Sequence, residues 1–151
     1  MISLTHNLII ILTGVIGATL TFYVSEELKQ GPVRASALLS LIVGLFFYCF
    51  PDVLSTYLTV NIQIVFIGTS FIGMVSSHAM ESYKRLAVAG SLFSIVYINN
   101  NNLFEGYGGA LGALALIALL ATMGMSTAFS KRTRIPHKLI ELRKWIVRQK
   151  D

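Results

Sequence analysis

The chain has 151 residues, of which 13% are charged and 54% are hydrophobic, and its net charge is +5 at pH 7. Soluble domains carry about 25% charged residues, so this composition argues against a soluble globular domain and indicates an integral membrane protein. The single cysteine, Cys49, excludes a disulfide framework within the chain and any cysteine metal site. Most of the positive charge follows Ser130, so it is not evidence for nucleic-acid binding.

Five apolar segments have about the length that a helix needs to cross a bilayer. A hydrocarbon core of about 30 Å takes about 20 apolar residues. The second segment stops at Pro51, as expected of a helix that ends before a proline. We therefore predict an all-α integral membrane protein. Residues 1–130 form a five-span helical bundle, with spans at about 7–25, 33–50, 58–77, 83–99 and 107–129.

Basic residues in the connecting segments predict the orientation of these spans. The first connection contains Lys29 and Arg34, the third contains Lys84 and Arg85, and the tail after Ser130 carries the other basic residues. The second and fourth connections carry no Lys or Arg. Because Lys and Arg gather on the cytosolic side of a membrane, we expect the N-terminus outside and the tail in the cytosol.

The fourth segment, 83–99, is short for a complete crossing. At 1.5 Å per residue it falls a few Å below a typical hydrocarbon core, although Lys84 and Arg85 can snorkel to the surface and close that gap. The alternative is four spans plus a re-entrant fourth segment. That arrangement would leave Lys84 and Arg85 outside if the tail stays inside, against the distribution expected of Lys and Arg.

Small residues recur at four-residue spacing, as expected where helices pack closely in a bilayer. These pairs are Gly14 and Ala18, Thr69 and Gly73, Gly73 and Ser77, Gly90 and Ser94, and the GxxxG pair Gly108 and Gly112. We expect most of them to pack helices within one chain. Five short helices leave little interior for a cavity, so we also expect a homo-oligomer with the third and fifth spans at or near its interface.

The polar residues of the third span gather on one helix face. At about 100° per residue, a third of the circumference holds all of its Ser and Thr residues between 69 and 77. Two interpretations follow: helix packing with hydroxyls bonded to their own helix, or the polar lining of a permeation path. The candidate residues are Gln63, Thr69, Ser70, Gly73, Ser76 and Ser77.

His78 and Glu81 lie three residues apart at the cytosolic end of this span. That spacing would let them share a metal ion or pass a proton. No third ligand is in sight, so we favour an interfacial histidine and a carboxylate that pairs with Lys84 or Arg85. We expect no metal and no cofactor.

The sequence lacks the patterns of coupled transport and of catalysis. No Asp, Glu, Lys or Arg lies centrally in a predicted span, although such residues mark proton relays and ion-coupled pumps. HExxH, GxSxG and Walker motifs are absent. We therefore expect a protein that is not an enzyme.

Residues 131–151 form a segment with a pattern of its own, predicted to be a basic amphipathic cytosolic helix with Pro136 in its first turn. Its apolar stripe consists of Ile135, Leu139, Leu142 and Ile146. Such a helix can lie on anionic headgroups or dock into a groove of a soluble partner. Its candidate binding residues are Arg134, Lys138, Arg143, Lys144, Trp145 and Arg148.

Two functions fit these predictions. The first is a homo-oligomeric membrane anchor, scaffold or sensor of the bacterial inner (plasma) membrane that engages a cytosolic partner or the inner leaflet through its tail. The second is a small homo-oligomeric channel or uncoupled permeation pathway, lined by the Ser/Thr/Gly face of the third span. Beyond the lipid bilayer and further copies of itself, a cytosolic protein is the expected partner, and nucleic acid is not expected.

Overall fold

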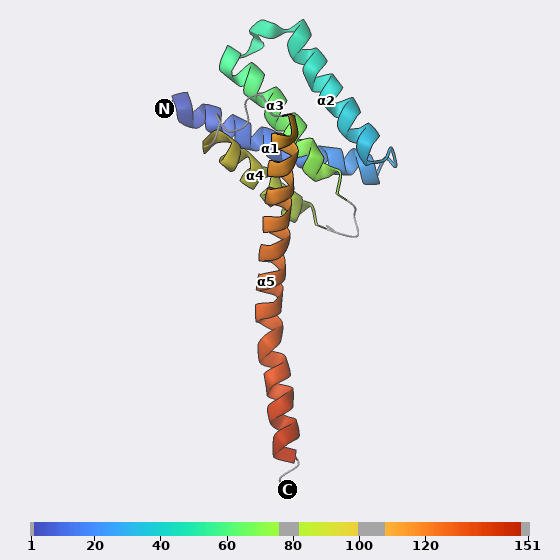
Figure 1. Ribbon diagram of the computed structural model, residues 1–151, viewed down its shortest axis with the longest axis vertical. Coiled ribbons are helices and arrows are strands. Elements are labelled where there is room, and N and C mark those ends of the chain that lie inside the picture. Colours follow the sequence, from blue (N-terminus) through green and yellow to red (C-terminus); the bar gives the residue numbers. More distant parts are fainter. Residues whose placement is uncertain (1, 76–81, 100–107, 149–151) are drawn as a thin grey trace.

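The computed structural model describes the backbone of residues 2–75, 82–99 and 108–148, and within these ranges it contains helices and no strand. The α-helices are α1 (Ile2–Glu26), α2 (Pro32–Cys49), α3 (Thr56–Gly73), α4 (Tyr83–Asn99) and α5 (Gly108–Arg148), and a short 3-10 helix, η1 (Pro51–Val53), follows α2. Figure 1 shows α1 to α4 gathered at one end of the molecule, with α5 running past them and away. The predicted all-α class is confirmed.

Four segments of these helices are long and apolar enough to cross a membrane: Leu4–Glu26, Pro32–Cys49, Thr56–Gly73 and Gly109–Phe129. They are compatible with an integral membrane protein. The remaining helix, α4, has 17 residues and measures about 25 Å at 1.5 Å per residue. That is about 5 Å less than a typical hydrocarbon core. Four candidate spans are therefore established, and a crossing by α4 stays a prediction.

The ends of the helices follow from the local sequence. Pro32 lies in the first turn of α2, where its missing N–H leaves no hydrogen bond unmade. The third helix ends before the predicted limit of its span, 58–77. Its last turn tightens at Met74, whose N–H donates to the carbonyl of Phe71 at 3.3 Å. Gly73 is the last helical residue, and glycine is a poor helix former.

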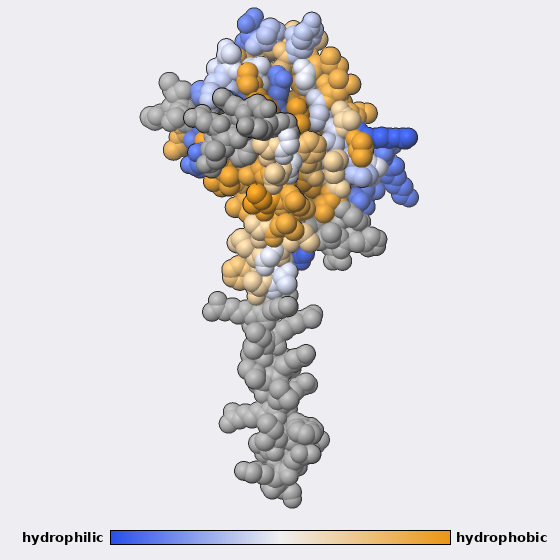
Figure 2. All heavy atoms as spheres, viewed as in Figure 1, coloured by the Kyte–Doolittle hydropathy of each residue, from blue (hydrophilic) through white to orange (hydrophobic). Residues whose placement is uncertain are grey.

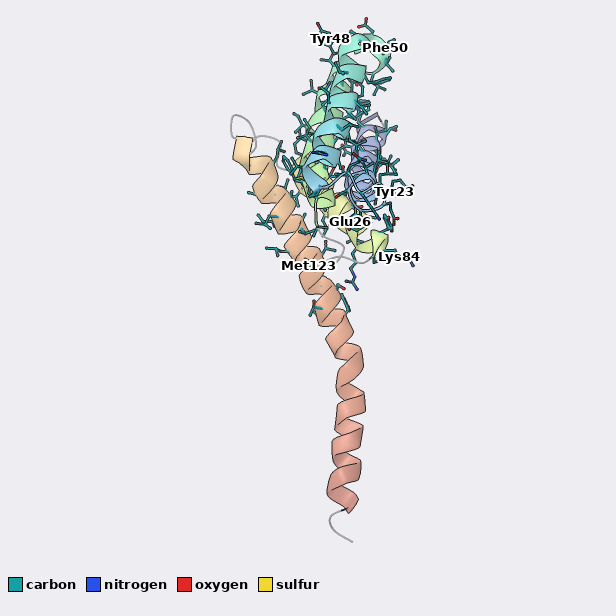
Figure 3. The ribbon with its side chains drawn as sticks, turned by 90° about the vertical axis from the view of Figure 1, so that its right-hand side faces the viewer. Tyr23, Glu26, Tyr48, Phe50, Lys84 and Met123 are labelled. Atoms are coloured by element: carbon teal, nitrogen blue, oxygen red, sulfur yellow. The ribbon has the colours of Figure 1, made fainter. Side chains whose placement is uncertain are left out.

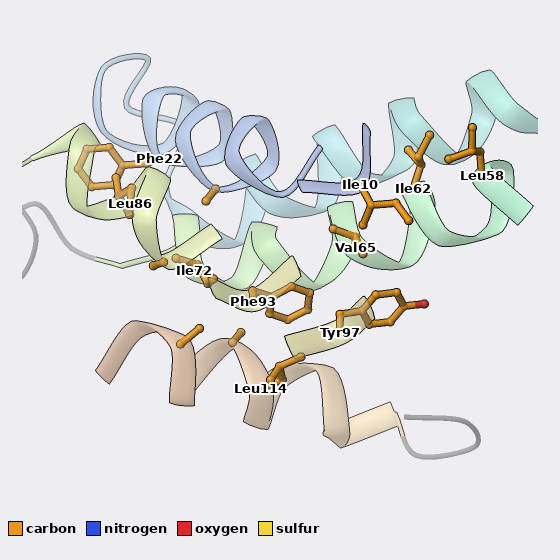
Figure 4. Packing of buried hydrophobic residues seen from close by; sticks show 14 of the residues in the cluster. Ile10, Phe22, Leu58, Ile62, Val65, Ile72, Leu86, Phe93, Tyr97 and Leu114 are labelled. Carbon is orange, nitrogen blue, oxygen red and sulfur yellow. The ribbon is translucent and has the colours of Figure 1, made fainter. Parts of the chain in front are cut away.

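The third helix is the centre of the bundle. It contacts each of the other four α-helices, and α1 packs against both α3 and α4. Figure 4 shows buried side chains filling the space where these helices face one another and α5. The larger members of this core are Ile10, Phe22, Phe47, Leu58, Ile62, Val65, Ile72, Leu86, Phe93, Tyr97 and Leu114.

The outer helices leave large apolar surfaces exposed. Leu12 of α1, Leu41 of α2 and Ile117 of α5 are each more than half exposed, at 51%, 61% and 63%. Figure 2 shows such hydrophobic surface over much of one face of the molecule. Water does not favour apolar surface of this extent, whereas the hydrocarbon of a bilayer does. This distribution agrees with the four candidate spans.

Glycines allow the closest approaches between helices. A methyl group added at Gly90 of α4 would lie 2.5 Å from the carbonyl oxygen of Gly14 in α1. A methyl group at Gly73 of α3 would lie 2.5 Å from the carbonyl oxygen of Ala18 in α1. No real Cβ atom comes so close to backbone, so both crossings depend on glycine. These small residues thus pack α1 against α3 and α4 inside one chain.

The fifth helix is continuous and much longer than the bundle. It has 41 residues, or about 61 Å at 1.5 Å per residue. Among the described side chains, Thr122 is the last buried one of α5, and the helix then leaves the bundle (Figures 1 and 3). The prediction that Pro136 starts a separate tail helix is therefore wrong. A proline inside a helix removes one hydrogen bond, but the Lys, Arg, Leu and Glu residues around it favour helix.

Two ends of the bundle are distinguished by their residues (Figure 3). We call one the basic end, where the connection between α1 and α2 meets the start of α4. The hydroxyl of Tyr83 donates there to Glu27 Oε1 at 3.4 Å. The charged side chains of these two segments are exposed or half-buried, and the basic ones are Lys29, Arg34, Lys84 and Arg85.

The opposite end is rich in exposed aromatic side chains, and we call it the aromatic end. It comprises the start of α1, the end of α2 with η1, the start of α3 and the end of α4. The ring of His6 stacks on that of Tyr57 with their centroids 5.8 Å apart. Tyr48 and Phe50 are 83% and 56% exposed there (Figure 3).

Candidate functional site

The polar face of α3 packs against α1 and α2. The Thr69 hydroxyl donates to the carbonyl of Val65 at 2.7 Å, and its side chain fills the space beside Gly17 of α1. The Ser70 hydroxyl donates to the carbonyl of Ile67 at 2.7 Å. Its oxygen also lies 2.7 Å from the hydroxyl oxygen of Ser36 in α2, where either group can be the donor. Thr69 and Ser70 are both 0% exposed.

The rest of that face is described only in part. Gly73 is buried against α1. Gln63, which precedes Thr69 and Ser70 on α3, is half-buried. Four of the residues singled out from the sequence lie outside the described residues, namely Ser76, Ser77, His78 and Glu81. From Val65 to Gly73, the hydroxyls of this face are bonded to backbone or to another helix, which is the helix-packing arrangement.

A second polar contact, which the sequence analysis missed, joins α3 to α4 near the aromatic end. The hydroxyl of Tyr97 donates to Asn61 Oδ1 at 2.9 Å, and Asn61 Nδ2 donates to the carbonyl of Tyr57 at 2.7 Å. Both side chains are buried. The signal that could have revealed it is the amide of Asn61 inside a predicted span, because a buried amide needs hydrogen-bond partners.

Among the side chains that the structure describes, two buried hydroxyls have no hydrogen-bond partner. They belong to Thr21 in α1 and Thr59 in α3. Thr21 is 0% exposed, and its Cβ is one of the atoms that a side chain at Gly73 would strike. A buried unpaired hydroxyl costs about 1–3 kcal/mol. The tight crossing of α1 and α3 therefore includes an unfavourable contribution.

Of the GxxxG pair at the start of α5, Gly112 does not pack against another helix of the chain. Gly108 is the first residue of the helix. A methyl group built on Gly112 meets nothing within 4 Å, and the same is true of Gly109 and Gly124 on the same helix. These three glycines of α5 therefore have open space beside them, whereas Ala115 and Ala118 of the same helix are buried in the core.

The described residues bring no metal-binding group together. Within them, no three His, Cys, Asp or Glu side chains are close enough to hold a metal ion. His6 stacks on Tyr57, and Cys49 is exposed and forms no disulfide bond.

The tail is described as backbone only. Residues 131–148 continue α5, so the predicted binding residues Arg134, Lys138, Arg143, Lys144, Trp145 and Arg148 lie on a helix that extends from the bundle. Their contacts stay a prediction. On an uninterrupted helix, the stripe of Ile135, Leu139, Leu142 and Ile146 keeps to one face, because the spacings of 4, 3 and 4 match the helical repeat.

Comparison of the chain with models of protein families, with curated proteins and with solved structures found no match in any of the three. The class that the fold defines is an all-helical protein with four helices able to span a membrane.

Proposed function

We propose that this protein is a non-enzymatic, homo-oligomeric membrane subunit that anchors in the bilayer and presents the end of α5 to a cytosolic partner protein. The observation that carries the proposal is the continuity of α5 from the bundle to Arg148. From Thr122 to Arg148 the helix extends for about 39 Å at 1.5 Å per residue. A rigid helix of that length reaches well beyond the headgroups, where a soluble protein can bind it.

The membrane placement we propose has five spans, with the N-terminus outside and the tail in the cytosol. Basic residues of the connections lie together at the basic end, as expected of a cytosolic face. Exposed aromatic residues lie at both ends, Tyr23 and Tyr83 at one and Tyr48 and Phe50 at the other (Figure 3), and aromatic residues favour membrane interfaces. The short α4 packs against α1, α3 and α5, so only part of its circumference meets lipid.

The partner-binding surface we propose is the apolar stripe of the tail. At about 100° per residue, Leu139 and Leu142 lie within roughly 60° of each other, and Lys144 lies on the opposite side. An apolar stripe flanked by basic residues fits a hydrophobic groove with an acidic rim. The direction of α5, away from the basic end rather than across it (Figure 1), favours a soluble partner over the leaflet surface.

The homo-oligomer is proposed to form through the outer face of α5. Ile117 and Leu120 are 63% and 56% exposed, and Gly124 has open space around it. On the helix wheel Ile117 and Gly124 fall on the same face as Leu139 and Leu142, within roughly 60°. Small residues on a lipid-facing helix allow close helix pairing. The third span is not part of the proposed oligomer interface, because α3 packs against the other four α-helices of its own chain.

A channel lined by α3 has less support. Thr69 and Ser70 are sealed against α1 and α2 and bonded to backbone carbonyls or to Ser36. A water path along this face would require α3 to separate from both helices and to lose the Ser36–Ser70 hydrogen bond.

Site-specific photocrosslinking tests the partner proposal in the full-length protein in its membrane. We expect a photoreactive residue at Leu142 to capture a soluble protein, and the same residue at Lys144, on the opposite side of the helix, to capture it weakly or not at all. Replacing Leu139 by Ala should reduce the capture. Crosslinks from position 142 to lipid alone, or equal capture from both positions, would contradict the proposal. Deleting residues 131–151 should abolish activity if the tail carries it and leave conduction largely intact if the protein is a channel.

Cysteine crosslinking tests the homo-oligomer separately. In a Cys49→Ser background, Ile117→Cys should form a disulfide between two copies, whereas Leu41→Cys should not, although both positions are exposed to a similar degree. A monomer in native mass spectrometry, together with no crosslink at position 117, would refute it.

A further inference from the structure

Among its described residues, the basic end carries more basic than acidic side chains. Lys29, Arg34, Lys84 and Arg85 are all exposed, and within the described part of the chain none of them forms an ion pair. The described carboxylates at this end are Glu26 and Glu27. In the part of this end that the structure describes, four cations thus face two carboxylates, one of which already accepts a hydrogen bond from Tyr83.

Three of these cations lie at helix N-termini, where the helix dipole is positive. Arg34 is in the first turn of α2, and Lys84 and Arg85 are in the first turn of α4. The first turn of a helix has unpaired N–H groups and the positive end of the helix dipole, which favours anions and disfavours cations. Neither first turn contains an acidic residue, and no side chain caps the N-terminus of α2. An anion bound near these two first turns would be favoured both by the cations and by the helix N-termini.

The surface next to these cations is apolar. Val33, beside Arg34, is 71% exposed, and Leu38 is 53% exposed one turn further along α2. Figure 2 shows hydrophilic residues over the turn between α1 and α2, directly beside hydrophobic surface. A ligand that meets both surfaces needs a negative head and long apolar chains, which a free phosphate or an acidic peptide does not have.

We propose that the basic end binds the headgroups of anionic phospholipids, with the phosphate near the first turns of α2 and α4 and an acyl chain along Leu38, one turn beyond Arg34. This inference rests on the membrane insertion that the proposed function includes, but it does not involve the tail or its partner. A cation near an anionic membrane surface contributes roughly 1 kcal/mol. Each cation removed should therefore weaken binding up to about fivefold.

Native mass spectrometry of the full-length protein, released from vesicles of phosphatidylcholine with and without phosphatidylglycerol, tests this inference. The wild type should retain phosphatidylglycerol in preference to phosphatidylcholine. The triple variant Arg34→Gln, Lys84→Gln, Arg85→Gln should lose that preference, with a fall in phosphatidylglycerol affinity of tenfold or more. The charge-preserving variants Arg34→Lys and Arg85→Lys should keep it, and helical circular dichroism should confirm that every variant is folded.

The matched control removes three tail cations by Arg134→Gln, Lys138→Gln and Arg143→Gln. It has the same net charge as the bundle variant and should retain the preference. Equal retention of both lipids by the wild type, or loss of the preference in the tail variant but not in the bundle variant, would overturn the inference. Either result would leave the crosslink from position 142 to a soluble partner unaffected, so the two proposals can fail separately.

Discussion

The crossing of α1 and α4 gives the sharpest prediction about stability. Replacing Gly90 by Ala adds a methyl group 2.5 Å from the carbonyl oxygen of Gly14, 2.9 Å from its carbonyl carbon and 3.3 Å from Ala18 Cβ. The first two atoms belong to the backbone of α1, so they can move only if the helix moves. A van der Waals contact of this kind needs about 3.5 Å, and α1 and α4 must therefore separate by up to about 1 Å.

Such overpacking costs about 1–3 kcal/mol, which lowers the ratio of folded to unfolded protein by about fivefold to more than a hundredfold. Gly124→Ala is the matched control, because a methyl group there meets nothing within 4 Å. That variant should be neutral or more stable by up to about 1 kcal/mol, since Ala favours helix over Gly. Unfolding in mixed micelles, followed by circular dichroism, measures both. Equal stabilities for the two variants would refute the packing assigned to α1 and α4.

Three further predictions address the polar contacts and the long helix. Tyr97→Phe leaves Asn61 Oδ1 without its donor and should lower the free energy of unfolding by about 1–3 kcal/mol. Tyr48→Phe, at an 83% exposed position, should change the free energy of unfolding by less than about 0.5 kcal/mol. Similar values for the two variants would contradict the buried Tyr97–Asn61 hydrogen bond. In a Cys49→Ser background, Ser70→Cys should resist a charged thiol reagent while Asp52→Cys reacts, and rapid reaction at position 70 would revive the water-lined path. Pro136→Ala restores an N–H inside α5 and should raise helicity without changing the direction of the tail; a large change of direction would mean that the proline ends the helix.

The sequence predicts the helical class well because a bilayer imposes its own length and composition on a chain. Segments without central charges and of about 20 residues admit one structure in hydrocarbon, and the bounds of α2 and α4 follow closely. Pro51 marks the end of α2, and Lys84 with Arg85 marks the start of α4. The fifth helix was harder, because Pro136 is equally compatible with a helix start and with a tolerated interior position.

The candidate site was predictable only as a face. Spacing placed Thr69, Ser70 and Gly73 together on α3, but it carried no information on which helix would cover them. They are buried because Gly17 of α1 lies beside Thr69 and Ser36 of α2 lies beside Ser70. The spacing of residues within one segment does not show which distant segments pack against it. Likewise, the small residues in the middle of α1 and at the start of α5 look alike in sequence, yet Gly14 is enclosed and Gly112 faces open space.

The central claim is that α5 carries the tail away from the membrane surface as one rigid helix. The distance between spin labels at Met125→Cys and Lys144→Cys, in a Cys49→Ser background and in bilayers that contain phosphatidylglycerol, tests it most directly. A continuous helix predicts a narrow distribution near about 29 Å at 1.5 Å per residue. A tail that turns at Pro136 to lie on the headgroups would give about 20 Å, because the two helical arms would then meet near a right angle. That shorter distance would contradict the account.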